Sequence, residues 1–304
     1  MDKKNKWPYQ LINQLTYRYY LIVRERNTTS SSHKTNHNPL WITGLFRSGT
    51  SLVAHIIQEL GGDLGPESHL LKGIKFRKEL NPDGFFENYL FMDWSLQVFE
   101  DLDSWGHKPP SIEQVESYEP NSNPKTFAFN SIVKYHDDRI SNRNKVKVLR
   151  QFSGLDLDQY MNTNFKNGVV VKNPHFAVLF PILSKKWPKS TFLVVFRNPD
   201  DTISSAKQIT PTADYTLYCK YYSGLLNDTE VNQIYLDYDQ LTSSPKKSIG
   251  KLAKRLNLND NDLNTAISLV EPNRSKHKGS AKGEWTNEVQ SIYLSMQKRA
   301  INRP

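Results

Sequence analysis

The 304-residue sequence has little that would stabilise a secreted or membrane-spanning protein. Cys219 is its single cysteine, which excludes an intramolecular disulfide and fits a reducing compartment. No apolar run reaches the roughly 18 residues of a membrane span, and the N-terminus lacks the apolar core of a secretory signal. We therefore expect a soluble, cytoplasmic protein.

Acidic residues are the scarcer charged class, with 31 Asp and Glu against 40 Lys and Arg and a formal net charge of +9. A basic surface suits an anionic cofactor, a nucleic acid or an acidic membrane. The sequence has no RNP-type motif of aromatic and basic residues, no zinc-ligand spacing and no helix-turn-helix signature. These absences argue against nucleic acid as a partner.

The N-terminal part differs in composition from the rest of the chain. Residues 7–26 are aromatic, apolar and basic, with apolar side chains near helical spacing. They predict a helix that docks on the main domain or, as the alternative, a helix that contacts a membrane surface. Residues 27–38 are rich in Ser, Thr, Asn and His, as in a flexible linker. We expect residues 1–38 to be this helix and linker and residues 39–304 to form the main domain.

The segment LWITGLFRSGTS, near the start of that domain, follows the spacing of a phosphate-binding loop. The Walker A pattern uses Gly, four residues, Gly, Lys and Ser or Thr to wrap backbone N–H groups around phosphates. Gly44 and Gly49 keep this spacing, and Ser51 supplies the hydroxyl. Thr50 occupies the lysine position, while Arg47 provides a cation three residues earlier. The alternative is a Gly/Ser turn that joins a strand to a helix and binds nothing.

A second candidate anion site lies in the segment TFLVVFRNPDDTISS. Residues 192–196 form a continuous apolar run, which is typical of a strand buried on both faces. Asn-Pro then forces a turn, and Asp200 or Asp201 is expected to cap the following helix. Arg197 at the strand end and Ser205 in the next helix would meet at the edge where α/β sheets bind ligands.

The remaining pattern alternates strands with helices. Apolar strands are predicted at 169–171 and 233–238, with helical spacing after each of them, including 246–256. This order favours an α/β fold, a three-layer sandwich with a central, mostly parallel sheet and a P-loop-like strand-loop-helix. Right-handed crossovers would place the loop after each strand along one edge of the sheet.

In these two segments the sequence resembles the sulfotransferases that use 3′-phosphoadenosine 5′-phosphosulfate (PAPS). The 5′-phosphosulfate loop of that family reads RSGT or KSGT, and it is matched here at Arg47, Ser48, Gly49 and Thr50. The 3′-phosphate element of the family reads Arg-Asn/Asp-Pro with a Ser eight residues after the Arg, and it is matched at Arg197, Asn198, Pro199 and Ser205.

Two further segments extend the resemblance over about residues 40–290. YDQL at 238–241, followed by Pro245, is similar to the YEDL…P segment of the family. KGSAKGEWTN at 278–287 is similar to the KGxxGDWKN loop that closes over the nucleotide, with one extra residue between the glycines and Glu for Asp. The resemblance implies cofactor contacts at Lys278 and Gly279, besides Ser51 in the phosphate loop.

The resemblance implies transfer of a sulfuryl group from PAPS to a hydroxyl, or in second place an amine, with release of adenosine 3′,5′-bisphosphate. The acceptor would be a small molecule, a glycan or a lipid, and no metal ion is needed because the sulfuryl group carries less charge than a phosphoryl group. A P-loop kinase is one alternative, but Thr50 and Lys172 stand where it needs a lysine and an acidic Mg²⁺ ligand. A non-catalytic nucleotide-binding module is the other.

Three residues are candidates for the general base that takes the acceptor's proton. His175 follows a strand in VVVKNPH, which is similar to the VxKxH segment of cytosolic sulfotransferases. Glu87 in NPDGFFEN matches a GxxE element of bacterial members and begins a helical pattern. Glu67, twenty residues after Arg47, ranks third. Arg47 would stabilise the leaving phosphate, and Lys172 would assist it or simply neutralise a carboxylate.

Overall fold

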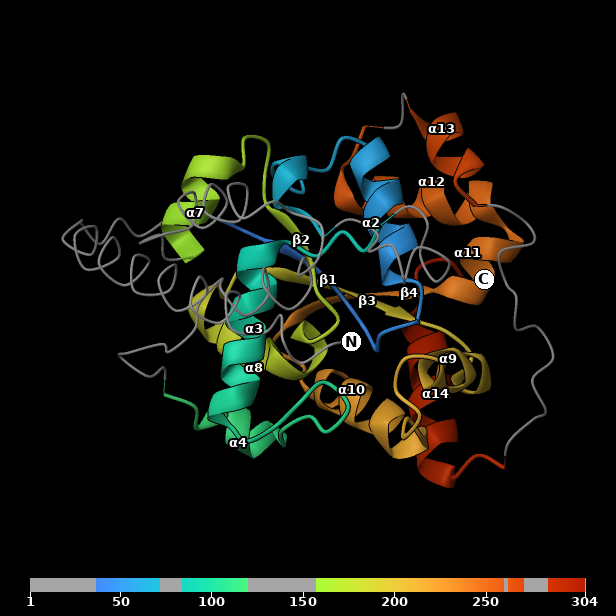
Figure 1. The fold of residues 1–304 in the computed structure, drawn as a ribbon. Helices are drawn as coiled ribbons and strands as arrows, with labels where there is room; N and C mark the ends of the chain where they lie inside the picture. Colours follow the sequence, from blue (N-terminus) through green and yellow to red (C-terminus); the bar gives the residue numbers. More distant parts are fainter. Residues whose placement is uncertain (1–36, 72–83, 120–156, 260–261, 271–283, 304) are drawn as a thin grey trace, which may run out of the picture.

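The computed structural model describes residues 37–71, 84–119, 157–259, 262–270 and 284–303 (Figure 1). The predicted N-terminal helix at 7–26 lies outside the described residues, as do Lys278 and Gly279. Within the described part of the chain, no helix is long and apolar enough to cross a membrane.

Four parallel strands form the central sheet in the order β2-β1-β3-β4. They are β1 (Leu40–Thr43), β2 (Val170–Lys172), β3 (Thr191–Phe196) and β4 (Asn232–Asp237). The predicted α/β fold with a parallel sheet is confirmed. The last strand ends one residue earlier than predicted, because Tyr238 already begins a helix.

Alternation along each strand sends apolar side chains into two separate cores. Trp41 of β1 and Phe192 of β3 face one core, whereas Ile42 and Leu193, the next residue in each strand, face the other. All four are fully buried. The continuous apolar runs in the sequence therefore reflect a sheet that is covered on both faces.

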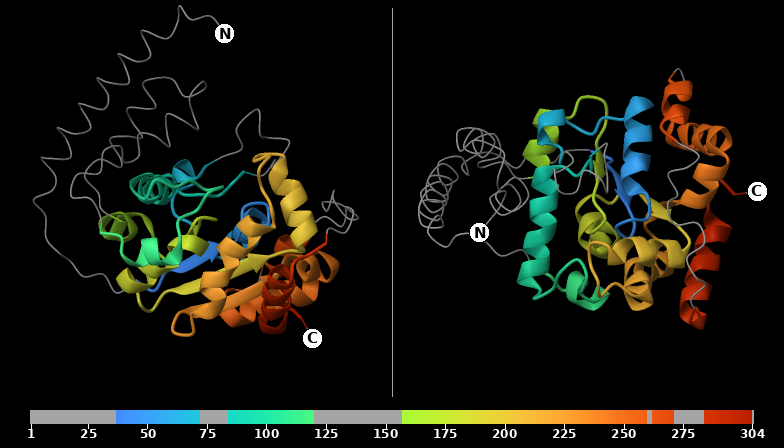
Figure 2. Two further views of the ribbon diagram at one scale, coloured as in Figure 1. Left: turned by 90° about the horizontal axis from the view of Figure 1, so that it is seen from below. Right: turned by 45° about the vertical axis from the view of Figure 1, so that its right-hand side comes forward.

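Helices cover both faces of the sheet (Figures 1 and 2). Against one face pack α2 (Thr50–Glu59), α11 (Tyr238–Ser243), α12 (Pro245–Leu256) and α13 (Leu263–Ser268). Against the other pack α3 (Tyr89–Asp101), α4 (Ile112–Glu116), α7 (Leu157–Asn164), α8 (Phe176–Lys186), α9 (Pro199–Lys207), α10 (Tyr215–Asn227) and α14 (Asn287–Arg299). The short 3₁₀ helix η2 spans Glu67–His69.

Two local predictions near helix starts are wrong. Asn198, and neither Asp200 nor Asp201, caps α9: its Oδ1 accepts hydrogen bonds from the backbone N–H groups of both aspartates. Asn198 directly precedes Pro199, the first residue of the helix, and its short side chain reaches the free backbone N–H groups. Both aspartates therefore fall in the first turn. Likewise α3 begins at Tyr89 with Asn88 as its cap, so Glu87 stays extended and bridges to Lys172 in parallel.

Gly49 belongs to the candidate phosphate loop, residues 44–51, and it lies against the ring of Tyr238, which is distant in sequence. Gly49 has a φ of 101° directly before α2. A Cβ added to it would lie 2.1 Å from Cδ2 of Tyr238, the first residue of α11. Both the backbone conformation and the space therefore require glycine.

We predict that Gly49→Ala destabilises the fold more than Gly168→Ala does. Gly168 has a similar φ of 96°, but nothing lies within 4 Å of an added Cβ. Strain alone should lower the free energy of unfolding of Gly168→Ala by roughly 1–2 kcal/mol. Gly49→Ala adds the clash with Tyr238 to the same strain. Urea denaturation measures both variants, and equal losses would show that the ring moves aside freely.

Candidate active site

The carboxyl ends of three neighbouring strands meet at one edge of the sheet. Residues 44–49 follow β1, Lys172 ends β2, and Arg197 follows β3. Because β1 pairs with both β2 and β3 in parallel, these segments lie side by side although they are distant in sequence. The predicted gathering of the candidate residues at one edge is thus a consequence of the strand order.

The loop after β1 presents an uncapped helix N-terminus. Gly49, in the N-cap position of α2, offers no side-chain cap to the first N–H groups of the helix. These groups and the positive end of the helix dipole attract an anion. Thr50 is only 3% exposed, so a lysine at this position would have to enter the core. The burial of Thr50 gives a physical reason why the cation comes from Arg47 instead.

Arg47 links the phosphate loop to the helix after β3. Its φ is 72°, and its Nε donates a hydrogen bond of 2.9 Å to Oγ of Ser205. Burial, followed by the positive charge of Arg197, lowers the pKa of Arg47. Two guanidinium groups that repel each other at a partly buried site favour the entry of an anion.

Arg197 is held by two carboxylates that the sequence reasoning did not identify. Its Nη2 lies 3.1 Å from Oδ2 of Asp201, and its Nε lies 3.6 Å from Oδ1 of Asp239. The guanidinium also stacks over the ring of Tyr238, at 5.3 Å from the ring centroid. The spacing of four residues between Arg197 and Asp201 was a signal for the first pair, whereas only the tertiary structure brings Asp239 close.

Lys172 is the buried cation of the site, with 2% of its surface exposed. Its ammonium forms an ion pair with the carboxylate of Glu87, and it donates to the carbonyl oxygen of Phe85 at 3.0 Å and to Oγ of Ser51 at 3.2 Å. Burial lowers the pKa of Lys172, and the negative charge of Glu87 opposes this shift. The lysine therefore does neutralise a carboxylate, and it also touches the phosphate loop.

Glu87 has one carboxylate oxygen engaged and one available. Oε1 contacts Lys172, whereas Oε2 is buried and has no hydrogen-bond partner among the described residues. Burial raises the pKa of Glu87, although the charge of Lys172 pulls in the opposite direction. A buried carboxylate with a raised pKa and a free acceptor oxygen has the properties of a general base.

His175 follows the same strand, three residues after Lys172, and it is half-buried, whereas Glu87 is buried. Its Nδ1 lies 3.3 Å from Oγ of Ser95, its ring packs on Phe99 with 4.8 Å between centroids, and a Cβ added to Gly106 would lie 2.9 Å from its Nε2. Burial, followed by the charge of Lys172, lowers the pKa of His175 to about 4. The imidazole is therefore neutral near pH 7, but it is a weaker base than an ordinary histidine.

The third candidate base has different surroundings. Glu67 is solvent-exposed in η2, whereas Glu87 is buried beside the lysine. The structure thus brings Glu87, Lys172 and Ser51 into direct contact, and it leaves Glu67 on the surface.

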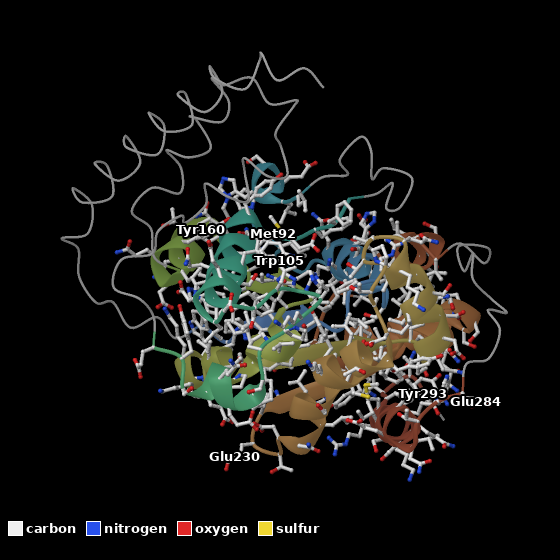
Figure 3. All side chains as sticks on the ribbon, turned by 60° about the horizontal axis from the view of Figure 1, so that its bottom comes forward. Met92, Trp105, Tyr160, Glu230, Glu284 and Tyr293 are labelled. Atoms are coloured by element: carbon white, nitrogen blue, oxygen red, sulfur yellow. The ribbon has the colours of Figure 1, made fainter. Side chains whose placement is uncertain are left out.

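A buried polar cluster supports the segment that carries Glu87. The hydroxyl of Tyr160 on α7 accepts a 2.7 Å hydrogen bond from Nδ2 of Asn88 and lies 2.9 Å from Nδ1 of His69. Tyr160 and Met92 of α3, both labelled in Figure 3, belong to the same hydrophobic core. The extended segment is also tied to Leu71, whose N–H donates to the carbonyl of Glu87 at 2.7 Å. No sequence signal pointed to this cluster, because its members come from distant segments.

Comparison with known proteins identifies a family. A family model described as "Sulfotransferase family" matches residues 39–262. No curated protein matches the chain.

Three solved structures are similar at low sequence identity. The sulfotransferase STF1 of Mycobacterium tuberculosis H37Rv is 15% identical, with 95% of this chain and 82% of that chain covered and a TM-score of 0.36. The sulfotransferase STF9 of Mycobacterium avium is 12% identical, with 93% and 79% covered and a TM-score of 0.36. The sulfotransferase domain of the Synechococcus PCC 7002 olefin synthase is 15% identical, with 88% and 97% covered and a TM-score of 0.40.

The lowered pKa of His175 predicts a specific acid sensitivity. Between pH 6.5, the ordinary histidine value, and about 4, the unfolded chain binds a proton that the folded protein does not bind at this residue. The free energy of unfolding should therefore fall as the pH falls through this window. His175→Gln removes this contribution, so its stability should depend less steeply on pH.

Urea denaturation at a series of pH values measures this dependence. His107, which is exposed, provides the matched control, and His107→Gln should keep the slope of the unchanged protein. Parallel curves for His175→Gln and the unchanged protein would contradict the assignment of a lowered pKa.

Proposed function

Because the chain belongs to the sulfotransferase family, we propose that it transfers a sulfuryl group from PAPS to a hydroxyl, or in second place an amine, and releases adenosine 3′,5′-bisphosphate. The observation that carries this proposal is the contact of Lys172 with both Ser51 of the phosphate loop and Glu87. Through it, an anion site and a candidate general base share one edge of the sheet.

Residues of the chain suit both phosphate-bearing ends of PAPS. The 5′ end is assigned to the loop from Arg47 to Ser51, where the uncapped start of α2 and a guanidinium supply positive charge. The 3′-phosphate is assigned to Arg197 and Ser205, and the resemblance adds Lys278 and Gly279. The mutual repulsion of Arg47 and Arg197 supports an anionic ligand at this place.

PAPS supplies the sulfuryl group when it is bound, and the chain supplies charge and a proton acceptor. Glu87 takes the acceptor's proton on Oε2, the oxygen that Lys172 leaves unengaged. Arg47 and Lys172 stabilise the negative charge that develops on the departing phosphate. His175 is the competing base, and its lowered pKa makes it the second choice.

The finer parts of the proposal rest on the sequence. The acceptor is a small molecule, a glycan or a lipid, the reaction requires no metal ion, and residues 39–304 form the sulfotransferase domain. Peripheral membrane contact through residues 7–26 and a cytoplasmic location stay predictions. A panel of sugars, lipids, phenols and peptides incubated with PAPS, and read by mass spectrometry, would identify the acceptor.

We predict that the protein binds adenosine 3′,5′-bisphosphate far better than AMP. Loss of one charge-assisted hydrogen bond costs about 1.5–3 kcal/mol. Arg197→Ala should therefore weaken binding of the bisphosphate roughly tenfold to a hundredfold in calorimetry and change AMP binding little. Arg255→Ala, on the exposed side of α12, is the control that should alter neither. Equal affinities of the unchanged protein for the two nucleotides would refute the 3′-phosphate site.

A second prediction ranks the candidate bases. Glu87→Gln should reduce turnover with an identified acceptor by about 10²–10⁴-fold, the contribution of a general base, and it should not weaken nucleotide binding. His175→Ala should slow the chemical step less. Glu100→Gln, an exposed change at the end of α3, is the matched control.

The opposite ranking would assign the proton to His175. If neither variant loses tenfold, both assignments fail and Glu67 becomes the next candidate. If no acceptor is turned over although the bisphosphate binds, the protein is a non-catalytic nucleotide-binding module.

A further inference from the structure

The hydrogen-bonding capacity of Lys172 is fully used. A lysine ammonium has three N–H donors and no acceptor. The three acceptors around Nζ are Oγ of Ser51, the carbonyl oxygen of Phe85 and Oε1 of Glu87. Any new acceptor near this ammonium must therefore displace one of the three.

Ser51 is where such a displacement would start. It is the second residue of α2, at the hydroxyl position of the phosphate loop. Its hydroxyl donates to the carbonyl oxygen of Phe85 at 3.3 Å and accepts from Lys172. An anion in the loop competes with Phe85 for the Ser51 proton and with Ser51 for the lysine. The same anion thus disturbs two of the contacts that fix Lys172.

The electrostatic forces on Lys172 would also change when an anion binds in the loop. The positive charge of Arg47, in the loop, lowers the pKa of Lys172, whereas the negative charge of Glu87 raises it. His175 also feels the charge of Lys172. An anion in the loop would reverse the net force on the lysine, because it neutralises Arg47 and attracts Nζ. Lys172 is the charged group in contact with Glu87, and its charge opposes the rise in pKa that burial gives the carboxyl group.

We propose that Lys172 couples occupancy of the phosphate loop to the strength of the base: a bound 5′-phosphate draws the ammonium away from Glu87, and the carboxylate becomes a stronger base only when the donor is present. The inference rests on the proposed function and adds regulation of the same site. Without the donor, the charge of Lys172 opposes the rise in pKa that burial gives Glu87, so the carboxylate is a weaker base than burial alone would make it. With the donor, Glu87 approaches the basicity that proton abstraction near neutral pH requires.

The proposal predicts proton uptake on nucleotide binding. Loss of the cation and arrival of negative charge both favour the protonated carboxyl group of Glu87. Calorimetry of adenosine 3′,5′-bisphosphate binding near neutral pH, in buffers of different ionisation enthalpy, should show uptake of a fraction of a proton per nucleotide, because a general base with a pKa near the working pH is only partly protonated. Glu87→Gln should abolish this uptake, and Glu100→Gln should retain it.

A second measurement needs no variant of the buried pair. Infrared difference spectra of the unchanged protein, with and without the bisphosphate, should show the carbonyl band of a newly protonated carboxyl group. Binding without that band and without proton uptake would overturn the coupling while leaving the proposed function intact. Uptake that persists in Glu87→Gln would do the same. Failure of the bisphosphate to bind at all would overturn the proposed function and this inference with it.

Discussion

The ion pair between Lys172 and Glu87 is the constraint on which the candidate site depends. Both side chains are nearly inaccessible to solvent, so each would carry a large desolvation cost without the other. Removing one partner of a buried pair typically costs about 3–5 kcal/mol. The pair fixes the end of β2 against the extended segment before α3, and Lys172 ties both to the start of α2 through Ser51. Lys172 therefore links the phosphate loop to Glu87, the candidate base.

Several charged side chains meet at this edge of the sheet. Asp201 and Asp239 pair with Arg197, and Glu87 pairs with Lys172. Arg47 donates to the hydroxyl of Ser205 and lies in the field of Arg197. An anion in the phosphate loop would be attracted by both guanidinium groups and by the uncapped start of α2.

The contrast between Glu87 and His175 shows how environment separates residues that a sequence leaves equal. Burial shifts both towards their neutral forms, which raises the pKa of the carboxyl group and lowers that of the imidazole. The shift strengthens the carboxylate as a base and weakens the histidine. The imidazole lies against Gly106, Phe99 and Ser95, whereas Oε2 of Glu87 has no hydrogen-bond partner among the described residues.

Short-range patterns in the sequence determined the parallel α/β fold, the strand-loop-helix at Gly44–Ser51 and the strand that ends before Arg197. Glycine spacing, apolar runs and an Asn-Pro turn are short-range signals, so they can be read from adjacent residues. Only the tertiary structure paired Glu87 with Lys172, 85 residues apart, and Asp239 with Arg197. The burial of a site and the charges around it depend on segments that are distant in sequence, and the strand order decides which of these segments meet. For that reason the sequence named the candidate bases, and only the fold shows how their surroundings differ.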